Sequence, residues 1–207
     1  MIDIRALDAL ELDGLREVAN IGAAHAATAL SQMTNRRISV TIPVIRIVRL
    51  EDVPEMTGDA DEAIAAVLMR VLGDAPGRTV QIFPADSASR LAGMLLGREQ
   101  VPFPAGFGDL ERSLLNEVGN IVVGACLNAL SEFLGMVLIM SVPALAIDKA
   151  GAILSASYLG FGDTGEYVLC IDTQLYISER SEPLRAHFLL IPETESLGAI
   201  LRAMNLR

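Results

Sequence analysis

The sequence predicts an α+β protein in which one unit of helices and strands is built twice. Three observations support this fold class. The chain resembles itself at an offset of 100 residues, each copy opens with a long stretch of helical period, and short apolar segments bounded by Gly and Pro follow. With 207 residues, of which 52% are apolar, the chain can bury a sizeable core.

The repeat is clearest in two stretches, "DGLREVANIGAAHAATALSQMTNRRISVTIP" and "SLLNEVGNIVVGACLNALSEFLGMVLIMSVP". They keep a glutamate, an asparagine and a proline at the same offsets: Glu17, Asn20 and Pro43, then Glu117, Asn120 and Pro143. We therefore expect a single domain over residues 1–207, made of repeats at approximately 1–100 and 101–207. Each half has an apolar β stretch that its own helices could scarcely cover, so the halves should share one core.

The first copy should begin with a helix over 9–34, capped by Asp8 with Glu11 three residues later. The segment "RISVTIPVIRIVRL" alternates like a strand interrupted at Pro43. Two strands joined by a turn at Pro76-Gly77 are expected in "AIAAVLMRVLGDAPGRTVQIF", and a helix in "PADSASRLAGMLLG". The Pro/Gly-rich segment 97–108 marks the join between the copies.

The second copy should begin with a helix over 109–134, capped by Asp109. Three further segments are expected to be strands: "SVPALAIDKAGAILSASYLGFG", "EYVLCIDTQLYIS" and "LRAHFLLIP". The segment "PETESLGAILRAM" repeats the Pro-initiated final helix. The order of elements therefore matches that of the first copy.

Composition excludes several classes of function. The formal charge is −10 with pI about 4.6 and no Lys/Arg cluster, so nucleic acid is not expected as a partner. The longest uncharged runs, 118–131 and 133–147, are shorter than the ~20 residues that span a bilayer, so no membrane insertion is expected. Cys126 and Cys170 stand alone in apolar runs and are expected to be core thiols. We expect a cytoplasmic protein without a structural zinc site.

Helical geometry places the repeated polar residues on one side. At 100° per residue, Asp13, Glu17 and Asn20 lie within about 60° of each other, and the apolar face is opposite. Beyond them runs an expected track of small residues that would let another protein come close: Ala24 and Ser31 in one helix, Gly124 and Ser131 in the other. An exposed Glu is usually just solvated, but Asn is mildly unfavourable inside a helix, which makes its repetition informative.

The spacing of the His, Ser, Asp and Glu residues indicates neither a catalytic nucleophile nor a metal bound by the protein. The chain has only His25 and His187, with no Ser-His-Asp arrangement that spacing can support and no paired ligands of the H-x-x-E kind. A phosphoryl group can nevertheless be transferred largely by positioning and charge stabilisation. A carboxamide can accept a hydrogen bond from water while it donates one to a phosphoryl oxygen.

The pattern Asp/Ser-x3-Glu-x2-Asn-x22-Pro, present from Asp13 and again from Ser113, resembles the signature of the CheC/CheX/FliY group of chemotaxis phosphatases. The resemblance covers the whole chain, and two signatures make it more similar to the two-site CheC type than to single-site CheX or longer FliY. It implies a fold in which the repeats share one mixed, largely antiparallel sheet about a pseudo-two-fold axis, with the long helices carrying the sites.

The resemblance also implies a function. The protein would dephosphorylate the aspartyl-phosphate of a CheY-type response regulator, which supplies its own Mg²⁺, so no cofactor of the phosphatase is needed. Asn20 and Asn120 would position the attacking water, and Glu17 and Glu117 would dock against the regulator's active-site lysine. The alternative is a non-catalytic adaptor of the chemotaxis and flagellar switch system that binds the receptor deamidase CheD or a regulator.

Supporting roles are expected nearby. Asp13 and Ser113 would be local hydrogen-bond partners or contacts at the rim of each site, while Pro43 and Pro143 would shape a strand at an edge or bulge. Ala19 stands where the second copy has Gly119, and its methyl group is expected to affect how closely a regulator packs against Asn20. The second site is therefore the safer assignment of the two, and the larger loss of activity is expected on replacement of Asn120.

Overall fold

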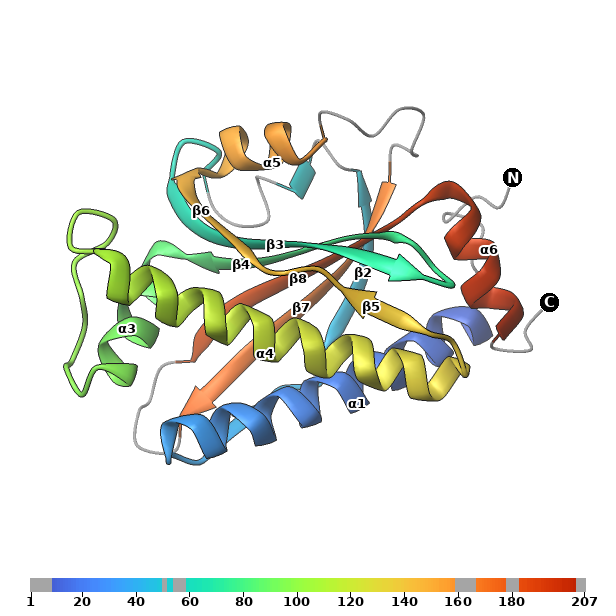
Figure 1. Ribbon diagram of the computed structural model, residues 1–207, viewed down its shortest axis with the longest axis horizontal. Coiled ribbons are helices and arrows are strands. Elements are labelled where there is room, and N and C mark those ends of the chain that lie inside the picture. The colour runs from blue at the N-terminus through green and yellow to red at the C-terminus, as the bar shows by residue number, and fades with distance from the viewer. Residues whose placement is uncertain (1–8, 50–51, 54–58, 159–166, 178–182, 204–207) are drawn as a thin grey trace.

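The computed structural model describes residues 9–49, 52–53, 59–158, 167–177 and 183–203. Within these ranges the chain forms one eight-stranded sheet. Two long helices, α1 and α4, lie side by side across one face of the sheet, and the short helix α5 lies over part of the other face (Figure 1). The predicted α+β class is confirmed.

The helices and strands follow the expected order, with one exception described below. The first repeat comprises α1 (Ala9–Thr34), β1 (Ile38–Val40), β2 (Val44–Arg49), β3 (Ala63–Gly73), β4 (Gly77–Pro84) and α3 (Ala85–Leu95). The second comprises α4 (Asp109–Leu134), β5 (Leu138–Met140), β6 (Ala144–Lys149), α5 (Ala150–Tyr158), β7 (Tyr167–Ile177), β8 (Leu184–Pro192) and α6 (Thr194–Ala203). Helix α4 has the predicted bounds and α1 ends where predicted, while Ala9, the first described residue, is already helical.

The repeats exchange strands. The sheet order is β1-β7-β8-β4-β3-β5, with β2 also pairing with β7 and β6 also pairing with β3. The edge strands of each repeat thus pair with a central strand of the other. All strand pairings among the described residues are antiparallel. Neither half can complete its part of the sheet with its own strands alone.

Each repeated proline lies at a β-bulge. Ile38–Val40 pair with 177–175 and Val44–Arg49 pair with 172–167, so residues 41–43 face only two residues of β7. The same one-residue shift occurs at 141–143, opposite β3. A proline has no N–H to give to a ladder, so Pro43 and Pro143 fit the interrupted pairing of a bulge.

Helices α1 and α4 cross each other at close backbone distance. A Cβ atom on Gly22 would lie 2.9 Å from the Cα of Cys126, so only glycine allows the backbone of α4 to approach α1 there. The two helices run in opposite directions (Figure 1). Together with α3 and α6 they cover the larger apolar core, whereas α5 covers a smaller one on the opposite face.

Helix α4 has the length and composition to cross a membrane, and it is the one helix in the described ranges that does. However, 44% of its most apolar window is buried inside the structure. Its apolar residues pack on α1 and on the sheet, as in the core helix of a water-soluble fold.

Two expectations about single elements were wrong. The segment 150–158, expected to continue a strand, is helix α5, whose Ala150, Ile153 and Leu154 are buried on one face. A short apolar run cannot by itself distinguish a strand from a buried helix. Asp109 is not a cap but the first helical residue: Gly108 precedes the helix, and its N–H donates to the Glu111 carboxylate at 3.0 Å. Asp8 lies outside the described residues.

Candidate functional site on the paired helices

The repeated polar residues lie on the outer surfaces of α1 and α4. Glu17 and Asn20 are one turn apart on α1, as are Glu117 and Asn120 on α4. Both glutamates are exposed and both asparagines are half-buried. Within the described ranges, none of the four side chains forms a hydrogen bond or ion pair. Their polar atoms are therefore available to a partner.

The antiparallel arrangement of the helices separates the two pairs. Glu17 and Asn20 precede the crossing at Gly22, and Glu117 and Asn120 precede the crossing at Cys126. Because α1 and α4 run in opposite directions, the two pairs lie on opposite sides of this crossing (Figure 1). The structure thus presents two separate sites rather than one shared site.

The rims of the two sites differ in charge. Asp13 is exposed and pairs with Arg16, Nη1 to Oδ1 at 3.0 Å, one turn before Glu17. Ser113 is exposed at the equivalent place on α4, and Asn116 occupies the position of Arg16. The first rim is therefore an ion pair and the second is neutral. The charges of Asp13 and Arg16 offset each other, so each site keeps one uncompensated carboxylate.

The residue before each asparagine faces the sheet rather than the solvent. Ala19 is only 6% exposed, and a Cβ atom on Gly119 would lie 2.6 Å from Cγ2 of Val67 on β3. The Ala19 methyl group therefore faces away from the surface on which a regulator is expected to pack. Glycine at 119 and alanine at 19 fit the different packing beneath the two helices.

The expectation of an exposed track of small residues along both helices is also partly wrong. Gly124 is buried beneath the Met140 side chain, so it offers no surface to a partner. Ser31 accepts a hydrogen bond from the Ile38 amide at 3.0 Å, and the Ser131 hydroxyl donates to the Met136 carbonyl. Ser31 therefore ties α1 to β1, and Ser131 ties α4 to the segment between α4 and β5.

A small cavity lies between α1, α4 and the sheet, next to the first site. Its volume is about 50 Å³, and its lining includes Ala19 and Ala23 of α1 and Cys126 of α4. Gln81, 1% exposed, contributes the polar part of the lining, and its Oε1 has no partner in the described structure. Burial raises the pKa of the Cys126 thiol to about 12, which makes it inert. The second site has Val67 beneath it instead.

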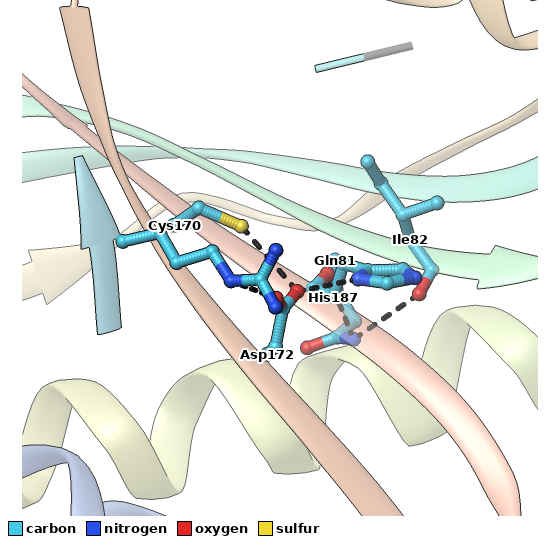
Figure 2. A network of polar contacts seen from close by, with 6 residues as sticks. Gln81, Ile82, Cys170, Asp172 and His187 are labelled. Atoms are coloured by element: carbon cyan, nitrogen blue, oxygen red, sulfur yellow. Dashed lines mark hydrogen bonds and ion pairs between the residues drawn. The ribbon is translucent and has the colours of Figure 1, made fainter. Parts of the chain in front are cut away.

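The structure contains a polar cluster that the sequence did not suggest (Figure 2). His187 Nδ1 lies 2.6 Å from Asp172 Oδ1, Arg46 Nε lies 3.3 Å from Asp172 Oδ2, and the Cys170 thiol donates to Asp172 at 3.6 Å. Burial is the main cause that raises the pKa of the Cys170 thiol, and the negative charge of Asp172 raises it further. The signal that could have revealed the pair is the antiparallel register, which places Asp172 opposite His187.

This cluster is separate from the helix sites. Cys170 packs with α5 on the face of the sheet opposite α1 and α4, and Asp172 follows it on that face. Its buried thiol is no nucleophile. In the described part of the chain, no three His, Cys, Asp or Glu side chains are placed to hold a metal ion. The helix faces instead offer a neutral amide beside a carboxylate, which suits orienting water and docking a cation.

Comparison with known proteins agrees with this arrangement. The CheC-like family pattern matches residues 10–47 and 110–147, which contain both Glu/Asn pairs and both bulge prolines. The CheY-P phosphatase CheC of Bacillus subtilis (strain 168) is 30% identical over 196 residues, which span 94% of each chain.

Two solved structures share the fold. FliY from Thermotoga maritima superposes with a TM-score of 0.77 at 20% identity, covering 97% of this chain and 98% of that one. A chain of the FliG-FliM complex from H. pylori gives a TM-score of 0.71 at 12% identity, covering 95% and 100%. The sequence relationship and the shared fold place the chain in a family of chemotaxis phosphatases. The chain belongs to the CheC-like family.

Proposed function

We propose that this protein hydrolyses the aspartyl-phosphate of a CheY-type response regulator, with Asn20 and Asn120 positioning the attacking water. The observation that carries the proposal is the pair of exposed, unpaired Glu/Asn sets at equivalent places on α1 and α4. The name of the Bacillus subtilis relative, a CheY-P phosphatase, supplies the substrate.

The proposed reaction requires the phosphatase to position the attacking water, and it requires neither a nucleophile nor a metal ion from the phosphatase. Water attacks phosphorus, the bond between phosphorus and the aspartyl oxygen breaks, and the products are the free carboxylate and inorganic phosphate. The Asn carboxamide would accept a hydrogen bond from the water through Oδ1 and donate through Nδ2 to a phosphoryl oxygen. A neutral amide does this without repelling the phosphoryl group. The Mg²⁺ that offsets the developing charge belongs to the regulator.

Glu17 and Glu117 would act in docking. Each carboxylate is exposed one turn from its asparagine, where it can pair with a lysine of the regulator and so hold the amide over the phosphorus. The ion pair would change the encounter and the bound geometry more than the bond-breaking step. Both sites can be used independently because they lie on opposite sides of the helix crossing.

The test is the decay of a phosphorylated CheY-type regulator with and without this protein. We expect faster decay, and a double Asn20→Ala, Asn120→Ala variant should lose activity by a factor on the order of 10²–10³ while still binding the regulator. Asn128→Ala is the matched control, since Asn128 is an exposed asparagine of α4 outside the motif. Full activity in the double variant would contradict the proposal.

Replacement of Glu17 and Glu117 by Ala should raise KM, with Glu132→Ala as the exposed α4 control.

A second candidate function is supported by the FliM chain, which has this fold in a complex with FliG. An adaptor that binds the regulator or CheD would leave the decay rate unchanged at saturating protein. Regulator binding without faster decay would therefore favour the adaptor.

A further inference from the structure

A groove of about 430 Å³ lies at one end of the sheet, and its lining includes Leu68, Arg70, Arg78, Val80, Ser141 and Val142. Ile64 and Ala66 of β3 pack with residues of α5 on the face opposite α1 and α4. Alternate residues of a strand share a face, so Leu68, Arg70 and Leu72 continue this face beyond the part that α5 covers. The groove is therefore remote from both Glu/Asn sites.

Apolar side chains extend the groove to the edge of the sheet. Leu72 lies directly opposite Ile139 of β5. Their side chains are 46% and 54% exposed, and that of Val142 at the bulge is 86% exposed. A cluster of exposed apolar side chains is typical of an interaction surface, whereas single ones are not informative.

Two arginines border these side chains. Arg70 and Arg78 are directly opposite each other on β3 and β4, an arrangement in which like charges repel. In the ranges that the structure describes, the Arg70 guanidinium forms no hydrogen bond or ion pair. The nearby Asp74 carboxylate accepts a hydrogen bond from the Val137 amide at 2.7 Å. Arg78 has an interaction of its own within the chain, so the positive charge left for a partner at this place is that of Arg70.

The other repeat reproduces this surface only in part. Ile42, 79% exposed, and Arg185 stand at the positions equivalent to Val142 and Arg78. The positions equivalent to Arg70 and Ile139 hold Gln174 and Ser39. The two ends of the sheet therefore differ in the cation and the apolar side chain that Arg70 and Ile139 provide, which the symmetry of the fold does not require.

We propose that Arg70, Leu72, Arg78, Ile139 and Val142, called here the amphipathic patch, dock an acidic amphipathic segment of a partner protein. A carboxylate of the segment would pair with Arg70, and its apolar side chains would cover Leu72, Ile139 and Val142. Charge complementarity selects this occupant. A second copy on a two-fold axis would bring the arginines of one patch against those of the other. An anionic membrane would repel the rest of this acidic chain.

The probe is a displayed library of random 12-residue peptides, selected on the immobilised full-length protein. Enriched peptides should combine Asp or Glu with Leu, Ile or Phe. By fluorescence anisotropy, their affinity should fall at least about tenfold in Arg70→Glu and in Ile139→Ser, and should weaken with added salt. Arg185→Glu is the matched control, because Arg185 is exposed on the same face of the sheet at its opposite end.

Both variants should retain the circular dichroism and the regulator-dephosphorylating activity of the parent, because the patch lies away from α1 and α4. The proposal is overturned if no peptides are enriched, if they lack acidic residues, or if Arg70→Glu leaves their affinity unchanged. A sedimentation coefficient that falls in Ile139→Ser would identify a second copy as the occupant instead. Flotation with phosphatidylglycerol vesicles that is lost in Arg70→Glu would identify a lipid surface.

Discussion

The two repeats agree on the outer surface of their long helices and differ beneath it. Glu17 and Asn20 correspond to Glu117 and Asn120 in residue type, exposure and place on the helix. Under the first pair, Ala19 and Ala23 line a cavity of about 50 Å³, whereas under the second Gly119 is in close contact with Val67. The surface offered to a partner is therefore repeated, while the support beneath it is not.

The far face of the sheet shows the same kind of divergence. One end carries Asp172 opposite His187, and the equivalent cross-strand pair at the other end is Leu68 and Val80. The first pair forms the polar cluster of Figure 2, and the second lines the groove beside Arg70. The comparison teaches that the two repeats have the same residues at the exposed Glu/Asn positions and different residues where their packing neighbours differ.

The largest expected effect comes from separating the repeats. Because β1 and β2 pair with β7, and β5 and β6 with β3, a fragment of residues 1–100 should lose the whole stability of the fold, about 5–15 kcal/mol for a typical domain. Circular dichroism should show no cooperative urea transition for this fragment alone, and a transition should return when residues 101–207 are added. A cooperatively folding 1–100 fragment would contradict the shared core.

The next effect tests the packing beneath each site. Gly119→Ala places a Cβ atom 2.6 Å from Val67 Cγ2, and overpacking by about 1–3 kcal/mol, less about 1 kcal/mol gained in helix propensity, should leave a net loss of up to about 2 kcal/mol. Ala19→Gly should cost about 1 kcal/mol, chiefly from helix propensity. Urea unfolding measures both. Val67→Ala should relieve the loss in Gly119→Ala, and equal losses with and without Val67 would refute the contact.

A smaller effect is expected on the activity of the single sites. Asn120→Ala should remove more than half of the phosphatase activity and Asn20→Ala less than half, because Gly119 beside Asn120 packs closely on Val67, whereas Ala19 beside Asn20 borders a cavity that leaves its amide less firmly held. Initial rates of regulator dephosphorylation at saturating substrate decide this. A larger loss in Asn20→Ala would show that the cavity does not weaken the first site.

The smallest effect concerns acid stability. Burial alone would raise the pKa of Asp172, but the hydrogen bond and charge of His187 and the charge of Arg46 outweigh it, so the pKa lies below its ordinary value of 3.8. A carboxyl group with a lowered pKa stabilises the fold above that value, and this contribution is lost as the pH falls through the folded-state pKa.

The wild-type protein should therefore lose up to about 1 kcal/mol more than Asp172→Asn between pH 5 and pH 3. Urea midpoints at several pH values measure the difference. Leu68→Asn, at the equivalent position of the other repeat, is the control that removes no titrating group. Parallel pH profiles for the wild type and Asp172→Asn would show that the carboxylate does not contribute.

Sequence and structure agree best where the signal is local. The bounds of α4 and the end of α1 could be read from the spacing of their apolar residues, and both Glu/Asn pairs lie on the outer faces that this spacing predicts. Helix α5 was missed because nine residues of mostly small apolar side chains carry too weak a period to separate helix from strand. The assignment of water positioning to Asn20 and Asn120 remains a prediction that the decay assay will decide.

The sequence alone determined the duplication, the α+β class and the residues that the two copies share, because helix period, strand alternation and residue identity are properties of neighbouring positions. Only the tertiary structure decided that the repeats exchange strands, that Ala19 and Gly119 face the sheet, and that Asp172 meets His187. These depend on pairing register and on contacts between segments far apart in the chain, which local patterns do not encode.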